Sequence, residues 1–127
     1  MPLSVDDRLE ILELMARYNH CADGGDGEGF ADTFTADALF EGSMSSARGR
    51  AELVQVIASG GGLWKHWLNS PIIEGDGDHA TAKVYLVRTG LGEDGEIGLV
   101  ASGTYHDTLA RIDGEWKFTH RKVHPDQ

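Results

Sequence analysis

Hydrophobic residues near the start of the chain recur every three or four positions, the spacing of an amphipathic helix, with charged residues between them. The stretch 4–7 resembles a capping box with Asp in place of the usual Glu. Gly24 and Gly25 supply the left-handed conformation that favours a helix end. We therefore predict a helix over about 5–22, with inward positions Leu9, Ile11, Leu12, Met15, Ala16 and Asn19.

Three shorter elements are expected next. Phe30 and Phe34, four residues apart, predict a short helix over 27–35. Residues 37–41 have a strand pattern, and a loop rich in Gly and Ser follows over 42–49. A third helix is predicted over 50–59, ended by the glycines at 60–62, with a buried stripe of Leu53, Val54, Val56 and Ile57.

From residue 64 the pattern changes to strands. The strand over 64–74 is interrupted by Pro71, which lacks a ladder donor and so indicates a sheet edge or a bulge. Asp113-Gly114 is the sequence of a type I′ hairpin turn. Further strands are expected over 80–90, 98–112 and 116–123, with turns at 75–78 and 92–95.

Helices followed by a meander of long strands predict an α+β fold. We expect a strongly curved, mixed or antiparallel sheet that forms a cone, covered by the three N-terminal helices. Gly98 and Gly103 fit the bends that such curvature demands.

Length and charge narrow the class of protein. A chain of 127 residues is expected to form a single domain over 1–127. A formal net charge of −10 argues against nucleic-acid or membrane partners, because both are anionic. The single cysteine, Cys21, permits no internal disulfide and suits the cytoplasm, and no apolar run approaches the roughly 18 residues of a membrane span.

Asp23 is the first candidate residue of a functional site. A carboxylate at a helix C-terminus is locally unfavourable, so a cap, solvent or a cation must favour it. We expect His66 to be that partner, inside a pocket. The simpler alternatives are a solvated Asp23, a structural His66, or pairing with His20 one turn away.

Other groups of residues give weaker evidence for a metal, phosphate or thiol site. The acidic turns lack the length and the bidentate Glu of a calcium loop, and no metal site is expected. The glycines at 60–62 lack the Lys-Ser/Thr tail of a phosphate loop. Cys21 lies within a helix without an evident base beside it, which disfavours a thiol nucleophile.

The chain from about 5 to 124 resembles the SnoaL-like branch of the nuclear transport factor 2-like superfamily, whose fold is a cystatin-like α+β barrel. The resemblance rests on an ordered series of residues: Tyr18, Asp23, Asp26, Phe30, Phe34, Asp37, Phe40, His66, Gly77-Asp78, Ala80, Ala82, Gly103-Thr104-Tyr105, Asp113-Gly114, Trp116-Lys117-Phe118 and Arg121.

The resemblance implies a catalytic pair. In the related scytalone dehydratase and hexachlorocyclohexane dehydrochlorinase, an Asp after the first helix pairs with a His near the start of a long strand. Asp23 and His66 match these positions. The second catalytic His of scytalone dehydratase falls near Ser102 here, so dehydration of scytalone itself is not implied.

An Asp that accepts the Nδ1 proton of His leaves Nε2 as a base for proton abstraction. We therefore expect a cofactor-independent lyase or isomerase acting on a small hydrophobic, cyclic or polyketide-like molecule. The alternative is a non-catalytic ligand-binding or subunit-assembly module of the same fold. The candidate wall residues are Tyr18, Trp64, Trp67, Asn69, Tyr85, Ser102 and Tyr105.

Three further expectations concern the strands. Tyr105 and His106 alternate, so only one faces the cavity, and we expect Tyr105. Arg121 is expected to pair with Asp107 across the last hairpin. Trp116 and Phe118 are expected on an exposed sheet face that pairs with another subunit, giving a homo-oligomer, a dimer or trimer as is usual in the superfamily.

Overall fold

The computed structural model describes residues 1–58 and 64–127. Its helices are α1 (Val5–Gly24), α2 (Gly27–Asp32) and α3 (Arg50–Ala58). Its strands are β1 (Phe34–Glu41), β2 (Ser46–Arg48), β3 (Trp64–Asp76), β4 (His79–Leu91), β5 (Ile97–Ile112) and β6 (Glu115–Pro125).

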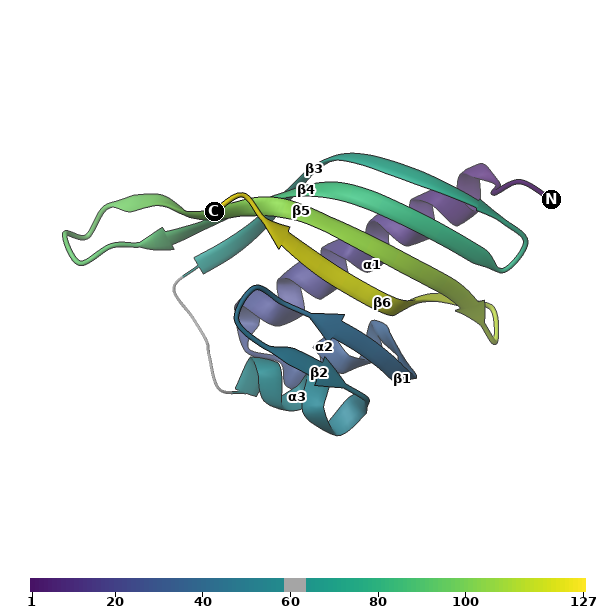
Figure 1. Ribbon diagram of the computed structural model, residues 1–127, viewed down its shortest axis with the longest axis horizontal. Helices are drawn as coiled ribbons and strands as arrows, with labels where there is room; N and C mark the ends of the chain where they lie inside the picture. Colours follow the sequence, from purple (N-terminus) through teal and green to yellow (C-terminus); the bar gives the residue numbers. More distant parts are fainter. Residues whose placement is uncertain (59–63) are drawn as a thin grey trace.

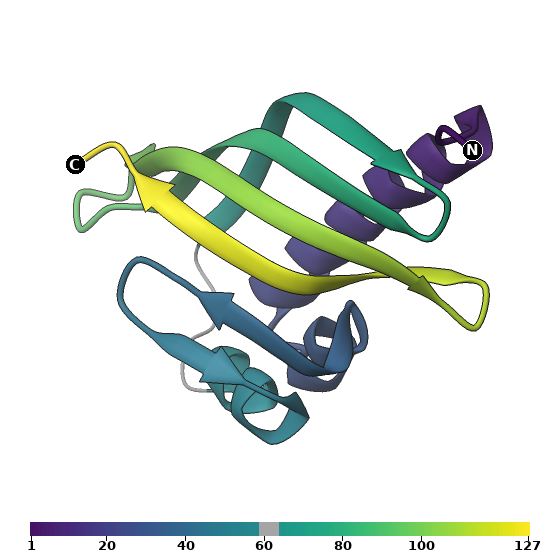
Figure 2. The ribbon, with the colours of Figure 1, turned by 45° about the vertical axis from the view of Figure 1, so that its right-hand side comes forward.

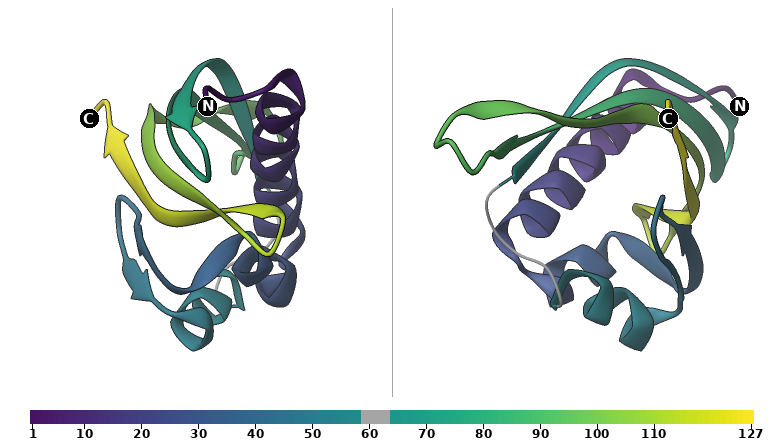
Figure 3. Two further views of the ribbon diagram at one scale, coloured as in Figure 1. Left: turned by 90° about the vertical axis from the view of Figure 1, so that its right-hand side faces the viewer. Right: turned by 60° about the vertical axis from the view of Figure 1, so that its left-hand side comes forward.

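The strands form one curved, mixed sheet in the order β2-β1-β6-β5-β4-β3 (Figures 1 and 2). Neighbouring strands are antiparallel except β1 and β6, which run parallel. Figure 3 shows α1 lying along the concave side of the sheet, with α2 and α3 grouped below it. The predicted α+β class and the curved sheet are confirmed, but the sheet stays open rather than closing into a barrel.

The start and end of α1 follow from its caps. Ser4 and Asp7 form the predicted capping box, and Gly25 ends the helix at φ 74°. Of the predicted inward positions, Ile11 and Met15 are buried, whereas Leu9, Leu12 and Ala16 are exposed. The buried face of the helix consists of Asp7, Ile11, Leu14, Met15, Tyr18 and Ala22.

Two short segments differ from the prediction. α2 ends at Asp32, and Phe34 begins β1, so the two aromatic rings are both buried but lie in different elements. The predicted loop over 42–49 contains β2, which pairs with the end of β1. The glycines at 60–62, expected to end the third helix, lie outside the described residues.

Pro71 lies in β3, at the edge of the sheet, as predicted. The pairing of β3 with β4 shifts between Asn69 and Ile72, and Ser70 adopts a left-handed φ of 57°. This bulge moves the register of β3 by one residue, and that shift decides what His66 faces.

The last hairpin turns at Asp113-Gly114, with φ values of 52° and 83°, as expected for type I′. The prediction that Trp116 and Phe118 are exposed is wrong, because both are buried on the concave side. Trp116 donates its Nε1–H to Asp7 at 3.0 Å, which joins the hairpin to α1.

A fully buried ion pair crosses the concave face. Arg121 donates through Nε to Asp107 Oδ1 at 2.9 Å, which confirms the predicted pairing across the hairpin. The Arg121 guanidinium lies 3.5 Å from the ring centre of Tyr105 and 4.3 Å from that of Tyr18. These stacked groups form the floor beneath the candidate site.

Candidate functional site

The last turn of α1 brings Asp23 to the beginning of β3. Asp23 Oδ1 lies 2.5 Å from His66 Nδ1, and both side chains are mostly buried. His20, the alternative partner, is exposed. A carboxylate at Nδ1 fixes the imidazole in the tautomer whose Nε2 is free to accept a proton.

Side chains of α1 also form hydrogen bonds with the backbone of His66. The backbone N–H of His66 donates to Asp23 Oδ2 at 3.0 Å, and the His66 carbonyl accepts from Asn19 Nδ2 at 3.4 Å. Asn19 and Asp23 lie four residues apart, on one face of the helix. Together they satisfy both groups that an edge strand leaves unpaired at this residue, so α1 holds the orientation of the imidazole.

The surroundings of His66 favour the neutral base. Burial lowers the pKa of His66, the Asp23 carboxylate raises it, and the cations Arg88 and Arg121 lower it further, with a net lowering. A lowered pKa leaves the imidazole unprotonated at neutral pH, which is the state that a general base requires.

His66 lines a cavity of about 200 Å³. The cavity lies between the end of α1, α3, the loop before β2 and the concave ends of β3 to β6. Its floor contains Tyr18 and Tyr105, whose hydroxyl oxygens lie 3.3 Å apart. Burial raises the pKa of both phenols, so they are neutral hydrogen-bonding groups.

Four predicted wall residues line this cavity, namely Tyr18, Trp64, Ser102 and Tyr105. Tyr105 is buried while His106 is exposed, which confirms the expected alternation. The other three predicted wall residues lie elsewhere, because they alternate with inward positions: Trp67 and Tyr85 are 56% and 55% exposed on the convex face, and Asn69 is exposed at the bulge.

The cavity also has walls that the sequence analysis missed. Arg88 projects into it from β4, directly across the ladder from His66. Its guanidinium lies 4.8 Å from the ring centre of Trp64. The remaining lining residues are mostly apolar, and they include Phe30, Phe40, Met44, Val56, Ile57, Leu86 and Val123.

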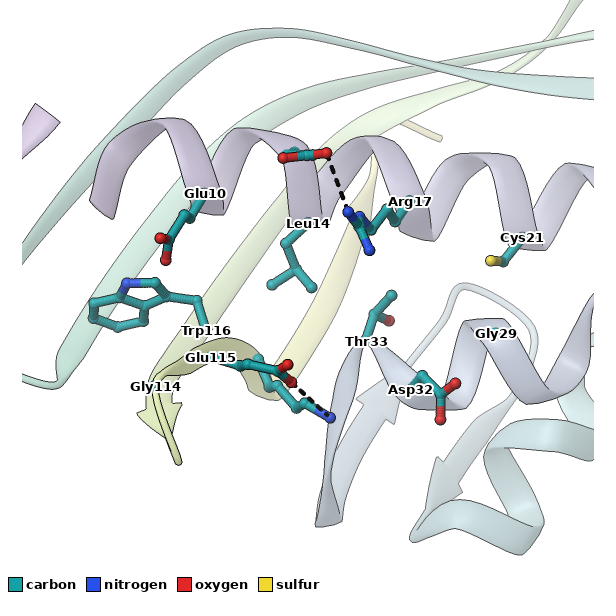
Figure 4. Close-up of a pocket in the computed structure, with 12 residues that line it drawn as sticks. Glu10, Leu14, Arg17, Cys21, Gly29, Asp32, Thr33, Gly114, Glu115 and Trp116 are labelled. Carbon is teal, nitrogen blue, oxygen red and sulfur yellow. Dashed lines mark hydrogen bonds and ion pairs between the residues drawn. The ribbon is translucent and has the colours of Figure 1, made fainter. Parts of the chain in front are cut away.

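A larger hollow of about 600 Å³ lies between α1, α2 and the last hairpin, away from His66 (Figure 4). Its acids are exposed and partly paired, as in Glu13–Arg17 and Glu115–Lys117. Burial and the Asp26 carboxylate raise the pKa of the Cys21 thiol there, which disfavours the reactive thiolate. The hollow therefore lacks the aligned base that the smaller cavity contains.

Two kinds of feature are absent from residues 1–58 and 64–127. No helix in these ranges has the length and apolarity needed to span a membrane. No three His, Cys, Asp or Glu side chains in them are grouped so as to hold a metal ion.

Solved structures similar to this chain share its fold over nearly its whole length. A variant of Rv3472, a protein of unknown function from Mycobacterium tuberculosis, is 31% identical with a TM-score of 0.88, covering 96% of this chain and 73% of that one. A protein of unknown function with a cystatin-like fold from Nostoc punctiforme is 30% identical with a TM-score of 0.88, covering 99% and 96%. ActVI-ORFA from Streptomyces coelicolor is 27% identical with a TM-score of 0.82, covering 94% and 96%.

Among curated proteins, none matches this chain. The family model described as SnoaL-like domain matches residues 4–122. This match spans all three helices and nearly all of the sheet, including Asp23 and His66. The chain belongs to the SnoaL-like domain family.

Proposed function

We propose that this protein is a cofactor-independent lyase or isomerase in which His66, oriented by Asp23, removes a proton from a carbon beside a carbonyl group. The observation that carries the proposal is the 2.5 Å contact between Asp23 Oδ1 and His66 Nδ1, on an imidazole that lines a cavity. A base placed in this way typically accelerates proton transfer about 10²- to 10⁴-fold.

The reaction follows from the positions of the groups. His66 Nε2 takes the proton, and the Asp23 carboxylate stabilises the imidazolium that forms. The electrons of the broken C–H bond then expel a β-leaving group, move an enone double bond after reprotonation, or attack a second carbonyl group. Tyr105 donates its hydroxyl to Tyr18, which leaves the neutral hydroxyl group of Tyr18 available as a hydrogen-bond donor on the floor of the cavity.

The cavity restricts the size and character of the substrate. About 200 Å³ is smaller than the roughly 300–1,000 Å³ of pockets for drug-sized ligands. Aromatic and aliphatic side chains form most of its wall. We infer a small hydrophobic substrate of one or two rings, consistent with the cyclic or polyketide-like compounds expected from the resemblance.

A panel of cyclic enones and β-hydroxyketones tests this proposal by absorbance, because dehydration or isomerisation changes conjugation. Turnover by the wild-type protein should be lost in His66→Gln and retained in His79→Gln, a matched change of an exposed histidine. If the variants at His66 and Asp23 alter ligand affinity while no compound is turned over, the protein is a binding module instead.

We infer in addition that the protein forms a homo-oligomer, a dimer or trimer, through its exposed apolar surface. The hairpin that joins β4 and β5 projects beyond the rest of the sheet (Figure 1). Leu91, Ile97, Leu99 and Val100 on it are 47–76% exposed. A single 13.8 kDa species in light scattering would contradict this.

A further inference from the structure

The cavity differs in charge from the rest of the molecule. The chain has a formal net charge of −10, and acids outnumber Lys and Arg by 21 to 11. Among the described residues that line the cavity, none is Asp or Glu, and Arg88 is the one Lys or Arg. A cation is therefore exposed to the ligand space without a carboxylate beside it.

Arg88 has no polar partner of its own in the part of the chain that the structure describes. Its Nε is buried and makes no hydrogen bond, and no carboxylate there forms an ion pair with it. Its contact is with the face of the Trp64 ring. A buried N–H without an acceptor is costly, so such a group is usually satisfied by water or by a ligand.

The ladder places Arg88 beside the base. His66 gives its backbone N–H and C=O to α1, so His66 and Arg88 form a non-hydrogen-bonded pair of the antiparallel ladder. Facing side chains approach each other most closely in pairs of this kind. Both side chains line the same cavity, so one small ligand can contact both.

We propose that Arg88 binds the oxygen on which negative charge develops when His66 removes the neighbouring proton, which makes the substrates carbonyl compounds that react through an enolate. This inference rests on the proposed function. As the C–H proton moves to His66 Nε2, the C–H electron pair forms a C=C bond. The carbonyl π pair then moves onto oxygen, and the single negative charge lies opposite the Arg88 guanidinium.

Arg121 does not serve this purpose. Its guanidinium is fully buried, pairs with Asp107 and is covered by the rings of Tyr18, Tyr105 and Phe118. It is not among the residues that line the cavity. Arg88 is therefore the cation that a ligand can contact.

A phenolate imitates an enolate oxygen on a planar ring, so the probe is 4-nitrophenol at a pH where it is ionised, with neutral 4-nitroanisole as the matched control. Calorimetry should show that the wild-type protein prefers the phenolate. Arg88→Met should weaken phenolate binding about 10- to 100-fold, the usual effect of losing a hydrogen bond to a charged group, and leave 4-nitroanisole nearly unchanged. Arg88→Lys should keep most of the preference, because the charge remains.

The His66→Gln variant separates this inference from the catalytic proposal. The phenolate preference should persist in it, because binding of the oxyanion does not require the base. If the preference holds and no compound is ever turned over, the proposed reaction fails but the assignment of Arg88 stands. The assignment is overturned if the wild-type protein shows no phenolate preference, or if Arg88→Met weakens both probes equally while thermal unfolding shows the variant is folded.

Discussion

Asp23 holds His66 at two points, accepting from the backbone N–H at 3.0 Å and contacting the imidazole Nδ1 at 2.5 Å. One carboxylate therefore aligns the strand and the ring together. This explains how an acid is tolerated at the unfavourable end of α1, because the edge strand supplies the hydrogen-bond donors that the helix end lacks.

Replacing either member of this pair should impair catalysis by different amounts. His66→Gln removes the base, and we expect kcat/KM to fall about 10²- to 10⁴-fold. Asp23→Asn keeps a hydrogen-bonding group but loses the charge that stabilises the imidazolium, so a smaller loss is expected. Steady-state kinetics measures both, with His79→Gln as the exposed control. An unchanged rate in His66→Gln would assign the base elsewhere.

The pH dependence should follow from the neutral imidazole. Because burial lowers the pKa of His66 below its ordinary 6.5, kcat/KM should rise with pH through a midpoint below 6.5 and then level off. In Asp23→Asn the midpoint should move lower still, because the carboxylate is what raises this pKa. NMR titration of the imidazole provides the independent check. A midpoint above 6.5 would mean that the carboxylate outweighs burial.

The buried ion pair should control stability. Burial raises the pKa of Asp107 to about 6 even though Arg121 lowers it. In Arg121→Met that pKa should rise further. The folded state then binds more protons than the unfolded one, so the free energy of unfolding should fall as the pH increases from the ordinary pKa of Asp toward the raised pKa of Asp107. Urea unfolding at pH 8 should show a loss of about 3–5 kcal/mol.

Two controls accompany the Arg121 variant. Adding Asp107→Asn should recover part of the loss, because no unpaired carboxylate then remains buried. Arg17→Met breaks only the exposed pair with Glu13 and should change stability by no more than about 0.5 kcal/mol. Equal losses in Arg121→Met at pH 5 and pH 8 would show that packing alone is responsible.

Gly103 and Gly98 form a matched pair of strand glycines. A Cβ on Gly103 would lie 2.6 Å from the carbonyl oxygen of His124, whereas one on Gly98 would meet nothing within 4 Å. We expect Gly103→Ala to destabilise the protein by about 1–3 kcal/mol through overpacking, and Gly98→Ala to be nearly neutral. Thermal unfolding compares them directly, and equal effects would contradict the close approach of β5 and β6.

The sequence predicted much of the fold because its signals are local. The capping box at Ser4 and Asp7, the stop at Gly25 and the turn at Asp113-Gly114 depend on neighbouring residues alone. The exposure of Leu9 and the burial of Trp116 were missed, because they depend on which faces of the helix and the sheet meet.

The bulge at Ser70 determines which residue of β4 lies across from His66. Near the 76–79 turn, Ile73 lies opposite Ala82, so the residue numbers of each pair add up to 155. That register would place His66 opposite Thr89, but the bulge lowers the sum by one and brings Arg88 across from it. Arg88 itself follows Ala82, Val84 and Leu86 on the inward face of β4, a local alternation that was not used to predict the cavity wall. Strict alternation from His66 would have excluded Trp67 and Asn69.

Proton abstraction by His66 can be measured without knowing the product. A carbonyl compound in D₂O exchanges the hydrogen beside its carbonyl group for deuterium whenever the base removes it, and proton NMR follows the loss of that signal. We expect the wild-type protein to accelerate exchange for small cyclic ketones or enones, and His66→Gln to lose most of the acceleration. Exchange at the same rate in the folded His66→Gln variant, or no acceleration by the wild-type protein for any such compound, would contradict a catalytic base at His66.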